Sequence, residues 1–326
     1  MSDFPAVKLH VVSGKGGTGK TTIAAGLALA LAAGGRQVLL TEVEARQGIA
    51  QLFDTPPLPY EERRVAVARG GGEVYALAID PEQALLEYLE QFYNLRRAGS
   101  MLKKLGAIDF ATTIAPGLRD VLLTGKVMEA ATRERRGGGR LYDAVVLDAP
   151  PTGRIAKFLN VNTEVAALTR MGPVRNQADS VMRLLKSNKT AVHLVTVLEE
   201  MPVQETADGV AELIATDLRP GAVIVNMVRD PLIPQDRLAA AAAGTIDPAE
   251  IGRGLKAAGL DDDAETASAL VGEVRDHARR IQLEQQELQT LTALDRPTYQ
   301  LPFIEDAAEL SGLQEIADRL QAAGMV

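Results

Sequence analysis

A glycine-rich loop is the strongest chemical signal in the sequence. Residues 14–21 read G-K-G-G-T-G-K-T and match the phosphate-binding pattern G-x-x-x-x-G-K-[ST] in full. In such loops backbone N–H groups surround the phosphates, and the N-terminus of the following helix adds a positive field. We expect Lys20 to reach the β and γ phosphates of ATP and Thr21 to ligate Mg²⁺. The predicted nucleotide-binding residues of the loop are Gly14, Gly16, Gly17, Thr18, Gly19, Lys20, Thr21 and Thr22.

A second lysine, Lys15, stands near the start of the same loop. It cannot easily reach the γ phosphate of its own nucleotide beside Lys20, which favours a role at the nucleotide of another subunit. The alternative is a solvated loop lysine without a catalytic role.

An acidic residue ends a second apolar run, Val145–Asp148, and the turn A-P-P-T-G follows it. A carboxylate at the buried end of a strand can hold Mg²⁺ through a water molecule, and the N–H of Gly153 could sense the γ phosphate. We therefore predict Thr21 and Asp148 as metal-site residues and Gly153 as a nucleotide contact. The alternative is an aspartate that only caps the next helix.

These residues need a scaffold that brings the ends of strands together. Apolar β-branched runs alternate with helical stretches, as expected for strands buried on both faces of a mostly parallel sheet with right-handed crossovers. The fold class is therefore α/β, a doubly wound P-loop NTPase sheet. The predicted strands are Leu9–Ser13, Gln37–Glu42, Val74–Asp80, Tyr142–Asp148, Ala191–Val197, Ala222–Met227 and Tyr299–Leu301.

Other stretches depart from this alternation. Residues 81–136 and 154–188 each read as consecutive helices. We expect both to be insertions that form a helical subdomain on one edge of the sheet, within a single ATPase domain over residues 1–326. Helix Pro81–Tyr93 is apolar on more than one side, which fits either a groove for a hydrophobic segment or a core helix. A long amphipathic helix is predicted over Ala264–Leu294, packed against the sheet.

Composition excludes several classes of site. The 326 residues include no cysteine, so disulfides, iron–sulfur clusters and thiolate metal sites are impossible within the chain. The three histidines are too far apart in sequence to suggest a zinc site, and a net charge of -8 argues against a broad nucleic-acid interface. No apolar run approaches the roughly 20 residues of a membrane span. The N-terminus lacks the pattern of a secretory signal, so we expect a cytoplasmic protein.

The loop G-K-G-G-x-G-K-[ST] resembles the deviant Walker A loop of the partition, septum-positioning, nitrogenase iron-protein and arsenite-pump ATPases. That resemblance implies face-to-face dimers in which Lys15 crosses the interface. There it would neutralise the charge that spreads over the transferring phosphoryl group, as an arginine finger does. The run D-A-P-P-T-G resembles the second switch of the arsenite-pump and guided-entry (ArsA-like) ATPases. Further matches to that family follow in the same order: Ile79-Asp80-Pro81, Ala115-Pro116-Gly117, Glu199, Glu205-Thr206, Val225-Asn226 and Leu301-Pro302. The resemblance implies that Asn226 and the backbone after Pro302, at Phe303, contact adenine.

The first switch departs from that family. Where the family usually has S-T-D-P-A-H, residues 42–47 read E-V-E-A-R-Q, which places Glu44 on the aspartate that positions the attacking water. Its extra methylene predicts slow hydrolysis, because a displacement of about 1 Å can cost roughly a hundredfold in rate. Arg154 stands where a histidine is usual. The missing cysteines count against a zinc-pinned homodimer and against thiolate capture of arsenite.

Residues 42–53 and 110–126 resemble the paired ATPases that actinobacteria carry within this family, which implies a paralogous partner. We therefore expect an ATP-hydrolysing dimeric switch that uses ATP and Mg²⁺. Its partner would be a paralogue in a heterodimer, with a homodimer as the alternative, and its client could be a hydrophobic protein. Two other functions stay open: a non-catalytic ATP-binding subunit, and a metabolic phosphotransferase or ligase on the same fold.

Overall fold

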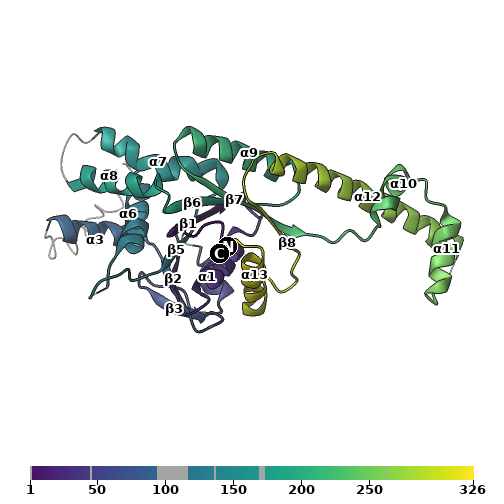
Figure 1. Cartoon of the computed structure of the whole chain (residues 1–326), viewed down its shortest axis with the longest axis horizontal. Coiled ribbons are helices and arrows are strands. Elements are labelled where there is room, and N and C mark those ends of the chain that lie inside the picture. Colours follow the sequence, from purple (N-terminus) through teal and green to yellow (C-terminus); the bar gives the residue numbers. More distant parts are fainter. Residues whose placement is uncertain (1, 45, 94–116, 136, 169–172, 262) are drawn as a thin grey trace.

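The computed structural model describes residues 2–44, 46–93, 117–135, 137–168, 173–261 and 263–326. At its centre lies an eight-stranded sheet with the strand order β3-β4-β2-β5-β1-β6-β7-β8 (Figure 1). All neighbouring strands are parallel except β3 and β4, which are antiparallel. The strands are β1 (Leu9–Gly14), β2 (Gln37–Glu42), β3 (Arg63–Val67), β4 (Glu73–Ala78), β5 (Ala144–Asp148), β6 (Thr190–Thr196), β7 (Pro220–Val228) and β8 (Thr298–Pro302).

The predicted doubly wound, mostly parallel α/β fold is confirmed. Each of the seven predicted strands is present, with ends that differ by a few residues. Strand β3 was not predicted, because it lies at the edge of the sheet and Arg63, Arg64 and Val67 are exposed. An edge strand needs no continuous apolar run, since one side of its backbone faces solvent.

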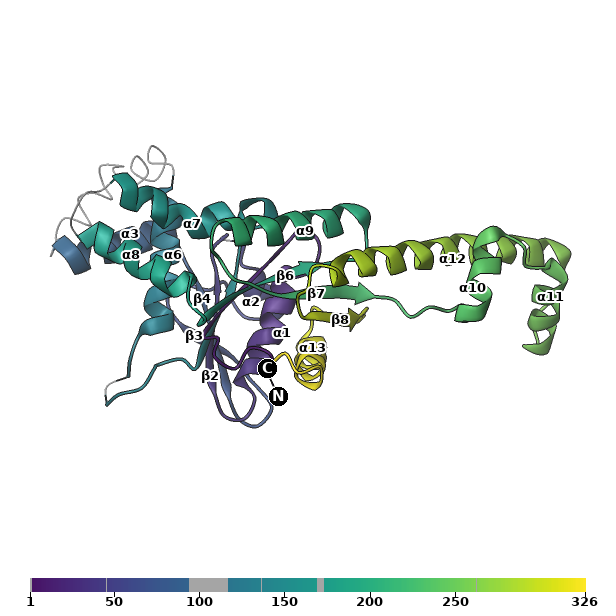
Figure 2. The same ribbon diagram turned by 45° about the horizontal axis from the view of Figure 1, so that its top comes forward.

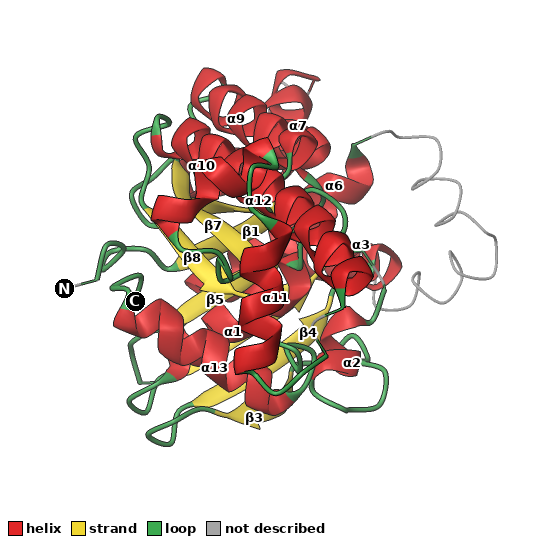
Figure 3. Ribbon diagram, turned by 90° about the vertical axis from the view of Figure 1, so that its right-hand side faces the viewer, coloured by secondary structure: helices red, strands yellow, loops and turns green. Residues whose placement is uncertain are grey.

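Helices cover both faces of the sheet (Figures 2 and 3). Helices α1 and α13 pack on one face, and α6, α7, α8 and α9 pack on the other. The helices are α1 (Lys20–Ala32), α2 (Gly48–Leu52), α3 (Pro81–Tyr93), α6 (Leu118–Thr132), α7 (Thr152–Leu168), α8 (Pro173–Leu185), α9 (Glu200–Ala215), α10 (Gln235–Ala243), α11 (Pro248–Ala257), α12 (Ala264–Thr292) and α13 (Leu310–Ala322). Because α6, α7 and α8 contribute to the core beneath one face, the expectation of a subdomain on the edge of the sheet is wrong for these helices.

The long predicted helix exists as α12, but most of it does not pack on the sheet. Only its last turns do: Leu291 belongs to a small core with Val223 and Val225 of β7. Further toward its start, Ala278 and Ile281 pack on α10 instead. Helices α10, α11 and the first half of α12 thus form an arm that extends from the body of the molecule (Figure 1). Within the described residues, no helix is long and apolar enough to cross a membrane.

The predicted insertions are described only in part. Residues 94–116 lie outside the described residues. They include Ala115, Pro116 and the beginning of the segment 110–126. On α3, Ala84 and Leu85 are buried. The side chains of the last apolar residues of that helix lie outside the described set, so the groove hypothesis stays a prediction, as does the division into inserted segments.

Candidate functional site

The residues predicted to bind nucleotide converge at the carboxyl ends of the parallel strands. The parallel strands β1, β2, β5, β7 and β8 all end there. Their ends carry Gly14, Glu42, Asp148, Asn226 and Pro302, respectively, at or near the last position. Ligands of open α/β sheets bind outside the carboxyl ends of the strands, so this end of the sheet is the candidate site.

The phosphate-binding loop joins β1 directly to α1, and two of its glycines are required by close approach. An added Cβ would lie 2.2 Å from the Val195 carbonyl oxygen at Gly14, and 2.5 Å from Asn226 Nδ2 at Gly19. Gly19 also has a φ of 85°, in the left-handed region. Beside Gly16 and Gly17 such an atom would meet nothing within 4 Å. The loop is therefore closely packed beneath and open on its outer side.

Within the loop, hydrogen bonds fix the backbone. Thr18 is buried and its Oγ1 donates to the Lys15 carbonyl oxygen at 2.9 Å. Lys20 and Thr22 are half-buried in the first turn of α1. The N–H groups of the first turn of α1 lack partners within the helix, which suits the binding of an anion.

Thr21 and Asp148, both predicted as metal-site residues, lie in hydrogen-bond contact. Thr21 Oγ1 donates to Asp148 Oδ2 at 2.7 Å. The other oxygen of this carboxylate, Oδ1, is buried and has no hydrogen-bond partner. Burial raises the pKa of Asp148 to about 6, the charges of Glu42 and Glu44 act in the same direction, and Thr21 and Lys20 oppose the shift. A hydroxyl beside a buried, unsatisfied carboxylate oxygen fits a site for Mg²⁺.

A metal ion could also bind to a cluster of acidic and histidine side chains. In the described ranges, no group of three or more His, Cys, Asp or Glu side chains is placed to hold one. Two histidines that are distant in sequence do lie together, because His10 Nδ1 is 3.0 Å from His193 Nε2 between β1 and β6. Both are fully buried, and burial lowers the pKa of His10 to about 3. This pair belongs to the interior of the sheet rather than to the candidate site.

Lys15 does not extend freely into solvent. Its Nζ lies 2.8 Å from Glu205 Oε1 on α9, and about a third of each side chain is exposed. Glu205 had been noted in the sequence only as part of a family landmark. The structure shows that its carboxylate holds Lys15 within the same chain.

The turn after Asp148 is tied to the end of β1. Ser13 Oγ donates to the Pro150 carbonyl oxygen at 2.6 Å, and the Ala149 N–H donates to the Val12 carbonyl oxygen at 2.9 Å. Gly153 is exposed in the first turn of α7, where an added Cβ would meet nothing within 4 Å. Its predicted contact with the γ phosphate stays a prediction.

Glu44 lies on the loop between β2 and α2, with a quarter of its side chain exposed. Together with Arg46, it lines a cleft of about 170 Å³ that Arg119 and Asp120 of α6 and Arg154 of α7 also line. Burial raises the pKa of Asp120, while the nearby Arg154 and Arg119 act against that shift. Arg154 thus faces the first switch loop.

Glu42, at the end of β2, was not among the candidate residues predicted from the sequence. Its side chain is buried, Oε1 accepts the Gln47 N–H at 2.9 Å and Oε2 accepts the Ile49 N–H at 3.2 Å. A signal was present, because a carboxylate that ends an otherwise apolar run is rarely buried without a purpose.

The residues expected at adenine lie side by side at the ends of β7 and β8. Asn226 Nδ2 donates to the Thr18 carbonyl oxygen at 2.9 Å, so this buried amide supports the phosphate-binding loop. Val228 pairs with Pro302, and the Phe303 N–H donates to the Val228 carbonyl oxygen at 2.8 Å. Phe303 is 52% exposed. Their contact with adenine stays a prediction.

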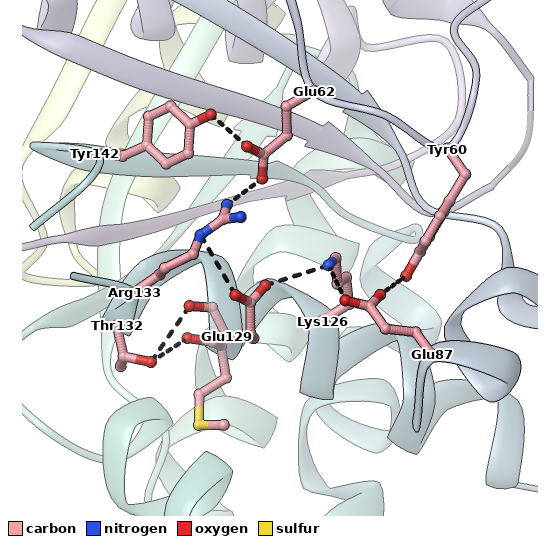
Figure 4. Close-up of polar contacts among 9 residues, drawn as sticks. Tyr60, Glu62, Glu87, Lys126, Glu129, Thr132, Arg133 and Tyr142 are labelled. Atoms are coloured by element: carbon pink, nitrogen blue, oxygen red, sulfur yellow. Dashed lines mark hydrogen bonds and ion pairs between the residues drawn. The ribbon is translucent and has the colours of Figure 1, made fainter. Parts of the chain in front are cut away.

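A chain of polar contacts connects the segment after α2 to α3 and α6 (Figure 4). The Tyr60 hydroxyl donates to Glu87 at 2.6 Å, and Lys126 pairs with Glu87 at 2.8 Å and with Glu129 at 3.3 Å. Arg133 continues the chain from Glu129 to Glu62, which also accepts the Tyr142 hydroxyl. The segment after α2 is thus attached to α3 by the Tyr60 hydroxyl and to the end of α6 by the ion pair of Glu62 with Arg133.

Comparisons with known proteins agree with this arrangement. The family model of the anion-transporting ATPases, ArsA_ATPase, matches residues 7–188. ATPase BagA of Mycobacterium tuberculosis is 52% identical over 325 residues, which cover 99% of this chain and 95% of BagA. A putative ATPase of Mycobacterium bovis, Mb3704, matches with the same identity and coverage. ATPase GET3 of Kluyveromyces lactis is 29% identical over 251 residues, 67% of this chain and 71% of GET3. The chain therefore belongs to the ArsA family of anion-transporting ATPases, and it is an ATPase.

Proposed function

We propose that this chain is an ATP-driven dimeric switch. Binding of Mg²⁺ and ATP closes two ATPase subunits on each other, hydrolysis reopens them, and the helical layer passes this motion to a client or partner. The observation that carries the proposal is the complete phosphate-binding loop with Thr21 and Asp148 paired at the end of the same sheet. Similarity to BagA and GET3, both named as ATPases, supports it.

Within one subunit the roles divide among a few residues. Lys20 and the N–H groups of the loop bind the phosphates, Thr21 and Asp148 would hold Mg²⁺, and Gly153 would sense the γ phosphate. When bound, Mg²⁺ would offset the negative charge of the β and γ phosphates. Asn226 and the backbone at Pro302 and Phe303 would line the base.

Glu44 is proposed to orient the attacking water. It is a partly exposed carboxylate on a loop that lies beside Thr21: an added Cβ at Gly48, at the start of α2, would be 3.2 Å from Thr21 Cγ2. The loop thus stays in reach of the metal and phosphate side of the site. A hydrolysis rate lower than that of aspartate-bearing relatives follows from the longer side chain.

Lys15 is proposed to act on the nucleotide of the second subunit. In the single chain it pairs with Glu205, so it must leave that carboxylate before it crosses an interface. A partly exposed ion pair contributes only about 0–1 kcal/mol, so contact with a triphosphate across the interface can replace it. The pair keeps Lys15 near the loop without preventing its transfer.

We propose a heterodimer with a paralogous ATPase as the working unit, from the resemblance to a paired branch and from Glu44 in the first switch. Co-expression with the paralogue should give a stable one-to-one complex whose ATPase rate exceeds that of either chain alone. Glu44→Gln in this chain should remove most of that rate. A fully active homodimer without affinity for the paralogue would contradict the heterodimer.

Product analysis separates the three functions. Free phosphate without an acceptor supports the switch, whereas phosphorylation of a small molecule would indicate a phosphotransferase. Tight ATP binding without turnover, alone and with the paralogue, would indicate a non-catalytic subunit. Purification from the native cell, followed by identification of the co-purifying chains and an ATPase assay of each species, identifies the partner.

A further inference from the structure

Glu42 is a buried carboxylate that the roles above do not use. It is the last residue of β2, its side chain is 4% exposed, and it pairs in register with Asp148 of β5. Its own carbonyl oxygen accepts the Ile79 N–H at 2.9 Å. The backbone of Glu42 is therefore fixed in the sheet, and a carboxylate buried there needs hydrogen-bond donors.

Both donors come from the chain just beyond Glu44. One carboxylate oxygen accepts the Gln47 N–H at 2.9 Å, and the other accepts the Ile49 N–H at 3.2 Å. The loop that carries Glu44 therefore begins after Glu42, and its far end is hydrogen-bonded to the side chain of the same residue. Two charge-assisted hydrogen bonds close the loop on itself.

Gln47 adds a second attachment at the same point. The φ of Gln47 is 56°, in the left-handed region that residues other than glycine rarely adopt. Contacts with the surrounding residues must therefore hold this backbone conformation. The amide of Gln47 accepts the Leu58 N–H at 2.7 Å and donates to the Leu58 carbonyl oxygen at 3.2 Å. The loop end is thus held from both sides, by the Glu42 carboxylate and by the backbone of the following segment.

We infer that Glu42 is a positioning residue for hydrolysis: it fixes the loop that carries Glu44 and so sets where the Glu44 carboxylate lies. This inference rests on the proposed role of Glu44. A cap for the short helix α2 would be a purely structural role for the same bonds. The two roles differ in one respect, because a positioning residue acts only through Glu44.

The first test measures amide exchange in the nucleotide-free full-length chain, so it does not depend on activity. Glu42→Gln keeps the size of the side chain but replaces one acceptor oxygen by an NH₂ group, which cannot accept a hydrogen bond from a backbone N–H. The amides of Gln47 and Ile49 should exchange about tenfold faster or more. Glu61→Gln, which removes the same charge from an exposed residue of the segment after α2, should leave them unchanged. Unaltered exchange in Glu42→Gln would overturn the inference.

The second test is a double-mutant cycle on steady-state hydrolysis in the active assembly. Glu42→Gln alone should lower kcat by about tenfold or more, with the KM for ATP little changed, because the substrate still binds to the phosphate loop. In a Glu44→Gln background it should cost nothing further. Gln47→Ala, which leaves the carboxylate intact, should lower kcat in the same direction.

The outcomes separate this inference from the proposed function. A kcat loss that multiplies with that of Glu44→Gln would overturn the positioning role and leave a structural cap. Normal turnover in Glu42→Gln beside slow turnover in Glu44→Gln would also overturn it, with the proposed function intact. Normal turnover in Glu44→Gln itself would instead contradict the proposed role of Glu44.

Discussion

The phosphate-binding loop and the loop after β2 flank the same site but are held in different ways. Residues 14–21 are held by close packing at Gly14 and Gly19 and by the join between β1 and α1, with one side-chain bond each from Thr18 and Asn226 to the loop backbone. The loop that carries Glu44 is held by side chains, Glu42 and Gln47, that bond to backbone groups. The first arrangement allows little variation in sequence. The second depends on residues outside any recognised motif and can differ between relatives that share a fold.

The largest effect is expected from a substitution in the phosphate-binding loop. Lys20→Ala should abolish ATP binding or turnover, because it removes the charge that faces the β and γ phosphates. Calorimetric ATP titration and phosphate release measure the two quantities. Lys186→Ala, the same change at an exposed residue paired with Asp217, is the matched control. Wild-type affinity and rate in Lys20→Ala would contradict the assignment of the site.

Asp148→Asn should separate function from stability. Turnover should fall by about a hundredfold or more, since an amide replaces the carboxylate proposed to hold Mg²⁺. In the metal-free chain, however, the variant should be more stable at pH 7. The folded pKa of about 6 lies above the ordinary value of 3.8, so the folded state binds the proton more tightly, and the wild type loses stability as pH rises from about 4 to 6.

Thermal unfolding in a chelator across pH 4–8 measures this difference. It should be smallest at pH 4, grow through the window and reach roughly 1–3 kcal/mol above pH 6. A stability difference that does not change with pH would show that burial of the Asp148 charge carries no cost.

The same contrast explains what the sequence alone could predict. The join of the phosphate loop to β1 and α1 and the parallel strands were predictable, because a motif or an apolar run reports directly on backbone geometry. Glu42 was not, because its role depends on which N–H groups the next loop brings to it. The arm was not predictable either, since the apolar stripe of α12 shows that the helix is partnered but not that α10 is the partner.

Lys15→Ala should have a smaller effect than Lys20→Ala. ATP binding should be largely kept while turnover falls several tens-fold, because a lysine acting in trans contributes mainly in the transition state. Single-turnover phosphate release and ATP titration separate binding from chemistry. Equal losses of binding and turnover would place Lys15 with Lys20, as an ordinary residue of its own nucleotide site.

The smallest effect is expected for Glu205→Gln. This change releases Lys15 from a partly exposed ion pair worth about 0–1 kcal/mol, so assembly or turnover should rise by no more than a few-fold. The protein concentration that gives half-maximal ATPase activity measures the change in assembly, and the maximal rate measures the change in turnover. Glu212→Gln, at an exposed position of the same helix, should have no effect. A large loss of turnover in Glu205→Gln would mean that Glu205 has a direct role in the reaction.

In the proposed dimeric switch, hydrolysis at this nucleotide site needs a second ATPase chain. The most direct measurement is the ATPase rate per chain as a function of protein concentration, for the chain alone and in equal mixture with its paralogue. We expect a rate that rises with concentration or with the paralogue and that Lys15→Ala largely removes. A rate that is independent of concentration and partner, in a monomer that Lys15→Ala leaves fully active, would contradict it.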